Sequence, residues 1–446
     1  MQQKKSINLG FRGWMLVIYQ FLAYMALMCF HNWPMNGLSE FYGGAQTITT
    51  IFTVASILGI VIQVIAARNI GKIKSVKALS IVLGVIAMAA SFGLMVIPPS
   101  TAWFVSYFIA CLVIAVWCTF VVGILIGQWF PRRKGTVMGI ATIAFPVGNA
   151  LLQPFMKKAF ATLPTTGKPD VFGAWLPFFI LICVGIVIGA AFVTDYPEQC
   201  GAYRDNDKSI TPEVAKAIME RDIENKRTSV WTLSNTLKCP DFWLLTLPSG
   251  LLLAGSVGMS TQTAKLFVKY GIDAEKEQFG LIMFGLAAFT VVGSYVLGVL
   301  DTKIGTRKAM MISTALMVVA GILGVLDSLP CAIAALWVLG LFMGAGSNFT
   351  VSSSVQYWRI EDFPNVFALV NPVANFLQAL APMVIAMLMF MNGAPDAAPP
   401  YMFVCVGGIV GTIMLALFKP ERVKAYDDKY RVAAGKALDE ALVGRK

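Results

Sequence analysis

Two short stretches place amide side chains inside long apolar runs. The first, "PVGNALLQ", covers residues 146–153, and the second, "NPVANFLQ", covers residues 371–378. The Pro-Val-x-Asn pattern of the first stretch returns 226 residues later, about half a chain length away. Hydrogen-bonding groups at matching places in two halves of a chain could bind one ligand between them.

Helical spacing gathers these amides into stripes. Residues three and four apart share a helix face, so Asn149 and Gln153 form one stripe, while Asn371, Asn375 and Gln378 form another. A polar stripe in a membrane span must face protein or a water-filled cavity, because unpaired polar groups are costly in lipid. Amides can instead hold helices together, at about 0.6 to 2 kcal/mol each. Because the pattern repeats at similar depth, we favour ligand binding.

Other side chains add to the candidates. His31 is the only His, Lys, Arg, Asp or Glu that lies well inside a predicted span. With an ordinary pKa near 6.5 it could carry a proton or meet a carboxylate, or it could be a neutral histidine bonded to an amide. Less specific candidates for the cavity wall are Tyr24, Trp117, Ser256, Asn348 and Gln356.

Composition restricts the class of protein. The 446 residues are 57% hydrophobic and 13% charged, which is too little polar surface for a soluble globule. The +11 charge is divided among connectors and forms no basic face for nucleic acid. One histidine excludes a paired-histidine zinc site, and no phosphate-binding glycine loop is present. We therefore expect no enzyme, no ATP-driven pump, no metal and no cofactor.

Twelve apolar stretches are long enough to cross a bilayer of about 30 Å. We expect spans at 14–38, 45–67, 76–98, 101–129, 136–160, 173–194, 241–268, 277–300, 308–329, 331–358, 365–391 and 400–418. The first apolar run is too long for a cleavable signal, so we expect an uncleaved anchor. The eight cysteines form no C-x-x-C pair, and we interpret them as small apolar packing residues.

The basic residues predict the orientation. The N-terminus and the connectors after spans 2, 4, 8 and 10 hold 14 Lys and Arg, against 6 in the opposite connectors. The positive-inside rule then puts both termini in the cytoplasm. We expect a multi-pass protein of the cytoplasmic membrane that acts as a monomer, with the lipid bilayer as its surroundings.

A long polar segment divides the spans into two sets of six. We expect a cytoplasmic N-terminus at 1–13, a first half at 14–194, a linker at 195–240, a second half at 241–418 and a tail at 419–446. Thr211 followed by Pro212 predicts that a helix begins there, solvated and amphipathic. The linker could also bind a regulatory partner.

Matching loops point to a known family. After span 2 comes "RNIGKIKSVKA", and after span 8 comes "GVLDTKIGTRKA". They resemble the G-x-x-x-D-[RK]-x-G-[RK] signature of the major facilitator superfamily, with Gly298, Lys303 and Gly305 in place. Thr302 stands where the family has its acid, and Asp301 precedes it. The resemblance covers residues 12–420 and implies an all-α membrane fold of two parallel, pseudo-repeated six-helix halves.

The resemblance also implies roles and a branch. The family's loops help to lock one conformation, which assigns gating to Gly71, Asp301, Gly305 and Arg307. "QWFPRRKGTVMG" at 128–139 and "DYPEQCGAYRDN" at 195–206 resemble segments of the oxalate/formate and monocarboxylate-like branch. We therefore expect a secondary transporter of a small organic anion, by proton symport or anion exchange.

The lack of charged residues deep in the predicted spans restricts the charge that the substrate can carry. Spans 8 and 11 carry no Lys or Arg at depth, so a small dianion would lose its hydration without compensation. A monocarboxylate or bulkier organic acid fits better. Proton coupling would use His31 or the substrate's own carboxylate; otherwise exchange or uniport is expected. The alternatives are a transporter-like solute receptor and a facilitator for a neutral or amphipathic solute.

Overall fold

The computed structural model describes residues 8–33, 45–69, 72–148, 170–272, 277–391 and 396–435. Within these ranges the regular elements are helices, and no strand is present. The first group of helices that run through the body of the molecule is α1 (Gly10–Trp33), α2 (Ala45–Asn69), α3 (Val76–Val96), α4 (Thr101–Ala115), α5 (Val122–Trp129), α6 (Lys134–Thr142), α7 (Ala144–Val147) and α9 (Val171–Phe192). The second group is α12 (Pro240–Thr261), α13 (Thr263–Val268), α14 (Glu277–Ile304), α15 (Thr306–Val325), α16 (Leu329–Met343), α17 (Ala345–Tyr357), α18 (Phe363–Met389) and α19 (Ala398–Leu417).

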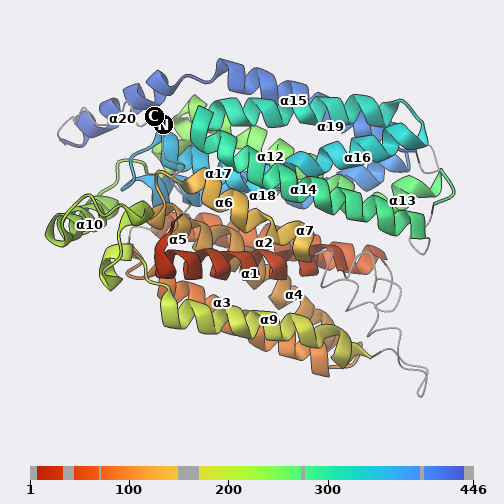
Figure 1. The fold of residues 1–446 in the computed structure, drawn as a ribbon, viewed down its shortest axis with the longest axis horizontal. Helices are drawn as coiled ribbons and strands as arrows, with labels where there is room; N and C mark the ends of the chain where they lie inside the picture. Colours follow the sequence, from red (N-terminus) through yellow and green to blue (C-terminus); the bar gives the residue numbers. More distant parts are fainter. Residues whose placement is uncertain are drawn as a thin grey trace.

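The two groups form the two halves of the molecule (Figure 1). Helices α3 and α9 pack together in the first half, and α15 packs against α19 in the second. The halves meet where α2 packs against α18 and where α6 packs against α14. Nine helical stretches of the described ranges are long and apolar enough to cross a membrane. The other three predicted spans fall on α1, on α2 and on α6 with α7.

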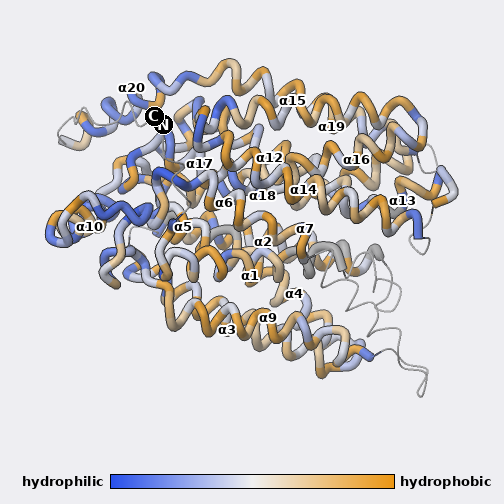
Figure 2. The backbone as a smooth tube through the Cα atoms, in the orientation of Figure 1, coloured by the Kyte–Doolittle hydropathy of each residue, from blue (hydrophilic) through white to orange (hydrophobic). Residues whose placement is uncertain are grey.

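Large apolar side chains cover the outside of the bundle. Leu281, Phe284 and Met387 are exposed on it, as a lipid-facing surface requires. Hydrophilic residues gather instead at one end, around the helices α10 (Pro212–Arg227) and α20 (Pro420–Ala433) (Figure 2). We call this end the linker face. Its hydropathy agrees with a body embedded in lipid and one end in water.

Local sequence signals explain several helix ends. Ser75 caps α3 by accepting a hydrogen bond from Ala78 N, and Thr211 caps α10 just before Pro212. Span 4 is continuous from Thr101 to Trp129 but contains a π-helical turn at Val116–Val121. Helix α18 runs unbroken through Pro372, where proline permits a bend.

The tail differs from the simple solvated segment that its composition indicates. It forms α20, in which Val423, Asp427 and Arg431 are buried. A short helix of the linker, α11 (Leu233–Lys238), lies next to it, since Tyr430 Oη donates to the carbonyl of Asn235. The physical reason is that α20 carries apolar and charged residues on one face, which pack on the linker.

Candidate functional site

One hydrogen bond joins the two halves deep in the bundle. Asn371 Nδ2, on α18 of the second half, donates to Gln63 Oε1, on α2 of the first half, over 3.0 Å. Both side chains are buried, at 4% and 1% exposure. Buried amides are costly unless they are paired, so this bond stabilises the contact between α2 and α18.

A cavity of about 40 Å³ lies beside this pair. Its polar lining comes from both halves: Ser56 and Gln63 on α2, Thr261 on α12, and Asn375 and Gln378 on α18. The remaining wall is apolar, from Leu27, Phe52, Ile60, Ala115, Val257, Ala379 and Pro382. The volume suits about one water molecule, so the cavity is too narrow in this conformation for a larger solute.

The amide stripe of the second half therefore reaches this cavity. Asn375 and Gln378 line it, and Asn371 makes the adjacent bond to Gln63. Gln63 and Thr261 did not emerge from the sequence pattern, because neither belongs to a repeated stripe. The available signal was a lone amide in the apolar run "ILGIVIQVIA", which indicates a buried partner but does not say which.

Several predicted positions lie outside the described residues. Asn149, Gln153 and Gly71 are among them, so the stripe of the first half has no structural account. The backbone of His31 belongs to α1, but its side chain is also outside the described part. The pairing of two matching stripes thus stays a prediction.

Three other candidates contact residues of their own half and are not part of the cavity lining. Trp117 Nε1 donates to Tyr19 Oη over 2.8 Å. Ser256 Oγ donates to the carbonyl of Leu252 on its own helix. Tyr24 is buried with its ring 4.8 Å from that of Phe145. These contacts place the three side chains in helix packing.

Close packing between the halves continues toward the linker face. On α14, Gly298 lies so close to α6 that a Cβ atom there would be 2.6 Å from Gly135 O. A Cβ atom at Gly139 would be 2.6 Å from Ser294 O. Glycine is required at such helix contacts because any side chain would push the backbones apart. The halves are therefore in direct contact on this side of the cavity.

Asn348 and Asp301 belong to this contact. Asn348 Nδ2 donates to Gly135 O over 3.3 Å, across the two halves. Asp301 is 2% exposed and lies against Gly135, while Thr136 N donates to Thr302 Oγ1 over 3.1 Å. Asn348 thus joins α17 to α6 and does not line the cavity.

The loop before α15 is held within the second half. The Thr306 hydroxyl lies 2.6 Å from Asp301 Oδ1 and 2.6 Å from Gln356 Oε1. Gly305 has φ +87°, a conformation that favours glycine. Arg307 Nε donates to Leu415 O over 2.9 Å. Gln356 and Arg307 therefore fasten this loop to its own half, and Asp301 also contacts the other half at Gly135.

The two stretches that resemble the organic-anion branch contact each other. Asp205 accepts hydrogen bonds from the backbone nitrogens of Arg132 and Arg133, at 3.0 and 2.9 Å. Trp129 Nε1 donates to Thr194 O over 2.9 Å. Burial raises the pKa of Asp205, and these backbone donors oppose the rise. The motifs hold the linker's start to the end of span 4.

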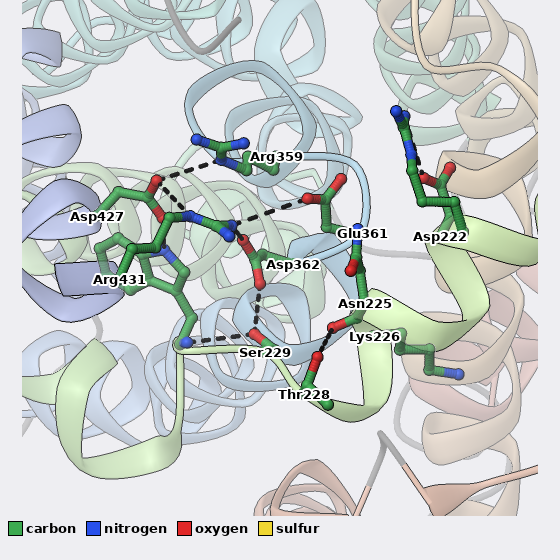
Figure 3. A network of polar contacts seen from close by, with 12 residues as sticks. Asp222, Asn225, Lys226, Thr228, Ser229, Arg359, Glu361, Asp362, Asp427 and Arg431 are labelled. Atoms are coloured by element: carbon green, nitrogen blue, oxygen red, sulfur yellow. Dashed lines mark hydrogen bonds and ion pairs between the residues drawn. The ribbon is translucent and has the colours of Figure 1, made fainter. Parts of the chain in front are cut away.

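A charged network lies at the linker face (Figure 3). Arg431 of α20 binds Asp362 at 2.8 Å and Asp427 at 2.9 Å, and Arg359 binds Asp427 at 3.2 Å. Glu361 lies 3.8 Å from Arg431. Among the described residues, three acids thus surround two guanidinium groups.

Burial within this network has an electrostatic consequence. Asp362 is buried, and desolvation raises its pKa to about 6, against the opposing effects of the Ser229 hydroxyl and Arg431. Ser229 belongs to the linker and its Oγ lies 2.5 Å from Asp362 Oδ1. The network therefore joins the linker, the connector before α18 and the tail helix. Among the residues the structure describes, no group of acids, cysteines and histidines is arranged to hold a metal ion.

Comparison with known proteins agrees with this architecture. A family model, the Major Facilitator Superfamily, matches residues 246–442, which is the second half and part of the tail. No curated protein matches the chain by sequence. The family model thus covers less than half of the chain, all of it in the second half and the tail.

Solved structures cover both halves. A proton:xylose symporter, XylE, superposes with TM-score 0.72 at 9% identity over 92% of this chain and 98% of that chain. The human organic anion transporter MFSD10 superposes with TM-score 0.68 at 14% identity, over 90% of this chain and 98% of that chain. The transporter FucP, in an outward conformation, superposes with TM-score 0.65 at 13% identity, over 91% of this chain and 98% of that chain. The chain has the major facilitator fold, an all-α membrane fold of two six-helix halves.

Proposed function

We propose that the chain is a secondary transporter of the major facilitator superfamily that moves a small organic anion by alternating access. The observation that carries the proposal is the cavity beside the Gln63–Asn371 bond, because its polar lining comes from both halves. In transporters built from two such halves, substrate sites lie between them near mid-membrane. Opening of one end would enlarge this cavity and leave its amides free to bind.

The substrate class is inferred from the chemistry of the lining. Amides and hydroxyls donate hydrogen bonds to a carboxylate, and the apolar wall accepts a hydrocarbon body. Among the described residues, the lining carries no charge, which favours a monoanion over a dianion. Similarity of fold to an organic anion transporter is compatible with this class but does not select it.

A second candidate rests on the same uncharged lining. Hydroxyls and amides alone bind neutral polar solutes well, so a facilitator or symporter for such a solute is the competing proposal. A panel of monocarboxylates and neutral solutes separates the two through thermal unfolding of the purified protein at two pH values. Stabilisation by acids alone supports the first candidate, and stabilisation by neutral solutes alone replaces it with the second.

The site itself is tested by transport in proteoliposomes. Asn375→Ala and Gln378→Ala should each raise the KM for the stabilising solute about tenfold, because each removes a hydrogen bond worth about 1 to 1.5 kcal/mol. Asn69→Ala is the matched control, since Asn69 lies at the exposed end of α2 and, among the described residues, donates to Ile65 O of its own helix. Unchanged kinetics in both site variants would remove α18 from substrate binding.

A further inference from the structure

A second cavity, of about 580 Å³, lies at the linker face. Three cationic side chains line it: Lys72, which follows α2, and Lys226 and Arg227 at the end of α10. Its lining, within the described ranges, contains no acid. The size is that of a small-ligand site, and its charge is that of an anion site.

Lys226 is the central observation. The residue is 7% exposed, yet among the contacts of the described residues its Nζ has neither an ion pair nor a hydrogen bond. Figure 3 shows its side chain directed away from the ion network. Burial lowers the pKa of Lys226, and the charge of Asp195 opposes this. The side chain is largely buried and its ammonium has no protein partner among the described residues, so its charge is available to an anion in the cavity.

Asp195 is the acid that acts on Lys226, but other groups occupy it. Its Oδ2 accepts from Ser75 Oγ over 2.7 Å, and its Oδ1 accepts from Lys77 N over 2.7 Å. These bonds keep Asp195 at the start of α3 and away from contact with Lys226. Asp195 lines a smaller adjacent cavity together with the same three cations, but it makes no ion pair with them among the described contacts and offsets their charge only in part.

Neutral donors complete the wall. Thr232 and Ser234 place hydroxyl groups on the lining, whereas the hydroxyl of Ser229, also on the lining, donates to Asp362. Lysine and arginine together with hydroxyls are the groups that proteins use to bind phosphate oxygens. Three cations match an anion with two or more charges better than they match a single carboxylate.

We propose that this cavity binds a compact, multivalent oxyanion of the phosphate class through Lys72, Lys226 and Arg227. The anion is free phosphate or pyrophosphate, or the phosphomonoester headgroup of a lipid. The site is distinct from the amide cavity between the halves, whose lining shares no residue with it.

The position of the site gives the anion a conformational effect. Lys72 follows α2 of the first half, whereas Asn365 and Leu369 on the same cavity wall belong to α18 of the second half. A ligand that contacts both sides binds best when α2 and α18 are together. It therefore stabilises the arrangement in which the linker face is closed, by its difference in affinity for the two conformations.

The test is thermal unfolding of the full chain in neutral detergent, titrated with pyrophosphate and with phosphate against sodium chloride of equal ionic strength. Lys226→Gln and Arg227→Gln should each raise the dissociation constant for pyrophosphate at least tenfold. Lys216→Gln is the matched control, because it removes the same charge from an exposed position of α10. If Lys226→Gln does not fold, Arg227→Gln and Lys72→Gln test the site in its place.

A second arm identifies the source of the anion. The wild-type chain and the same variants are compared in nanodiscs of phosphatidylcholine with and without phosphatidic acid. Stabilisation by pyrophosphate that depends on Lys226 supports a free anion, and stabilisation by phosphatidic acid alone that depends on Lys226 supports a lipid headgroup. No stabilisation by either probe, or equal stabilisation of wild type, Lys226→Gln and Lys216→Gln, would overturn the proposal.

Discussion

At the scale of single residues, the sequence predicted which amides share a face but not what they face. The spacing of Asn371, Asn375 and Gln378 is enough to place them on one side of a helix, and two of them line the cavity. Their partner Gln63 is separated from Asn371 by 308 residues, and helix periodicity carries no information about such a contact. Trp117 and Ser256 are equally polar, but each hydrogen-bonds within its own half.

Residue-level electrostatics also predicts a pH effect at Asp362. Its folded pKa of about 6 lies above the ordinary value of 3.8, so the folded state binds the proton more tightly than the unfolded state. The free energy of unfolding should therefore rise as the pH falls from 7 to 5, by about 1 kcal/mol. This gain should be lost in Asp362→Asn, as measured by Tm across that range.

Asp428→Asn is the control for this prediction. It removes an acid from α20 but has no contact in the network, so its Tm should follow the pH dependence of the wild type. An Asp362→Asn variant that keeps the wild-type profile would show that another group titrates.

At the scale of elements, the linker is a packed unit, although its sequence reads as a solvated connector. The predicted helix forms, with Thr211 as its cap, because capping is a local property. The contacts that hold it are not local. Arg204 binds Glu198 at 2.9 Å and Asp222 at 2.6 Å, and both acids are 4% exposed. A pattern of mixed charges does not reveal which pairs become buried.

This ion triad yields a stability prediction. Arg204→Ala leaves two buried carboxylates without their cation and should destabilise the protein by about 3 to 5 kcal/mol. Arg221→Ala should cost less than about 1 kcal/mol, because Arg221 is 64% exposed and lies 3.8 Å from Asp222. The measurement is Tm at pH 7 in the same detergent. Equal losses in the two variants would mean that the triad contributes little.

At the scale of the whole molecule, composition and internal repetition indicated twelve spans in two sets of six, and the family resemblance implied how the two halves pack. Apolar runs, a polar midpoint and paired loops define two six-helix halves, and the solved transporters share that arrangement. The sequence did not predict which conformation the two halves adopt. It depends on glycine contacts such as Gly139 with Gly298, and glycines are frequent in membrane helices for many reasons.

Those contacts make the conformation testable. Gly298→Leu should separate α14 from α6 and open the linker face, because the new side chain would overlap the backbone of Gly135 and Gly139. Spin labels at the exposed residues Lys74 and Lys429, in a background with the native cysteines replaced, should report a longer distance than in the unsubstituted chain. Gly280→Leu is the control, since nothing lies within 4 Å of a Cβ atom there. An unchanged distance would show that the contact does not hold the halves together.

The partnership between the linker and the tail helix has a consequence for how the chain is made. Trp231 Nε1 donates to Asp427, which lies 196 residues later, and its ring packs against Trp358 and Tyr430. A ribosome that has finished the linker must still produce the whole second half before this tryptophan finds its partner. The linker is thus fixed to the second half late in synthesis, after the helices of that half have been made.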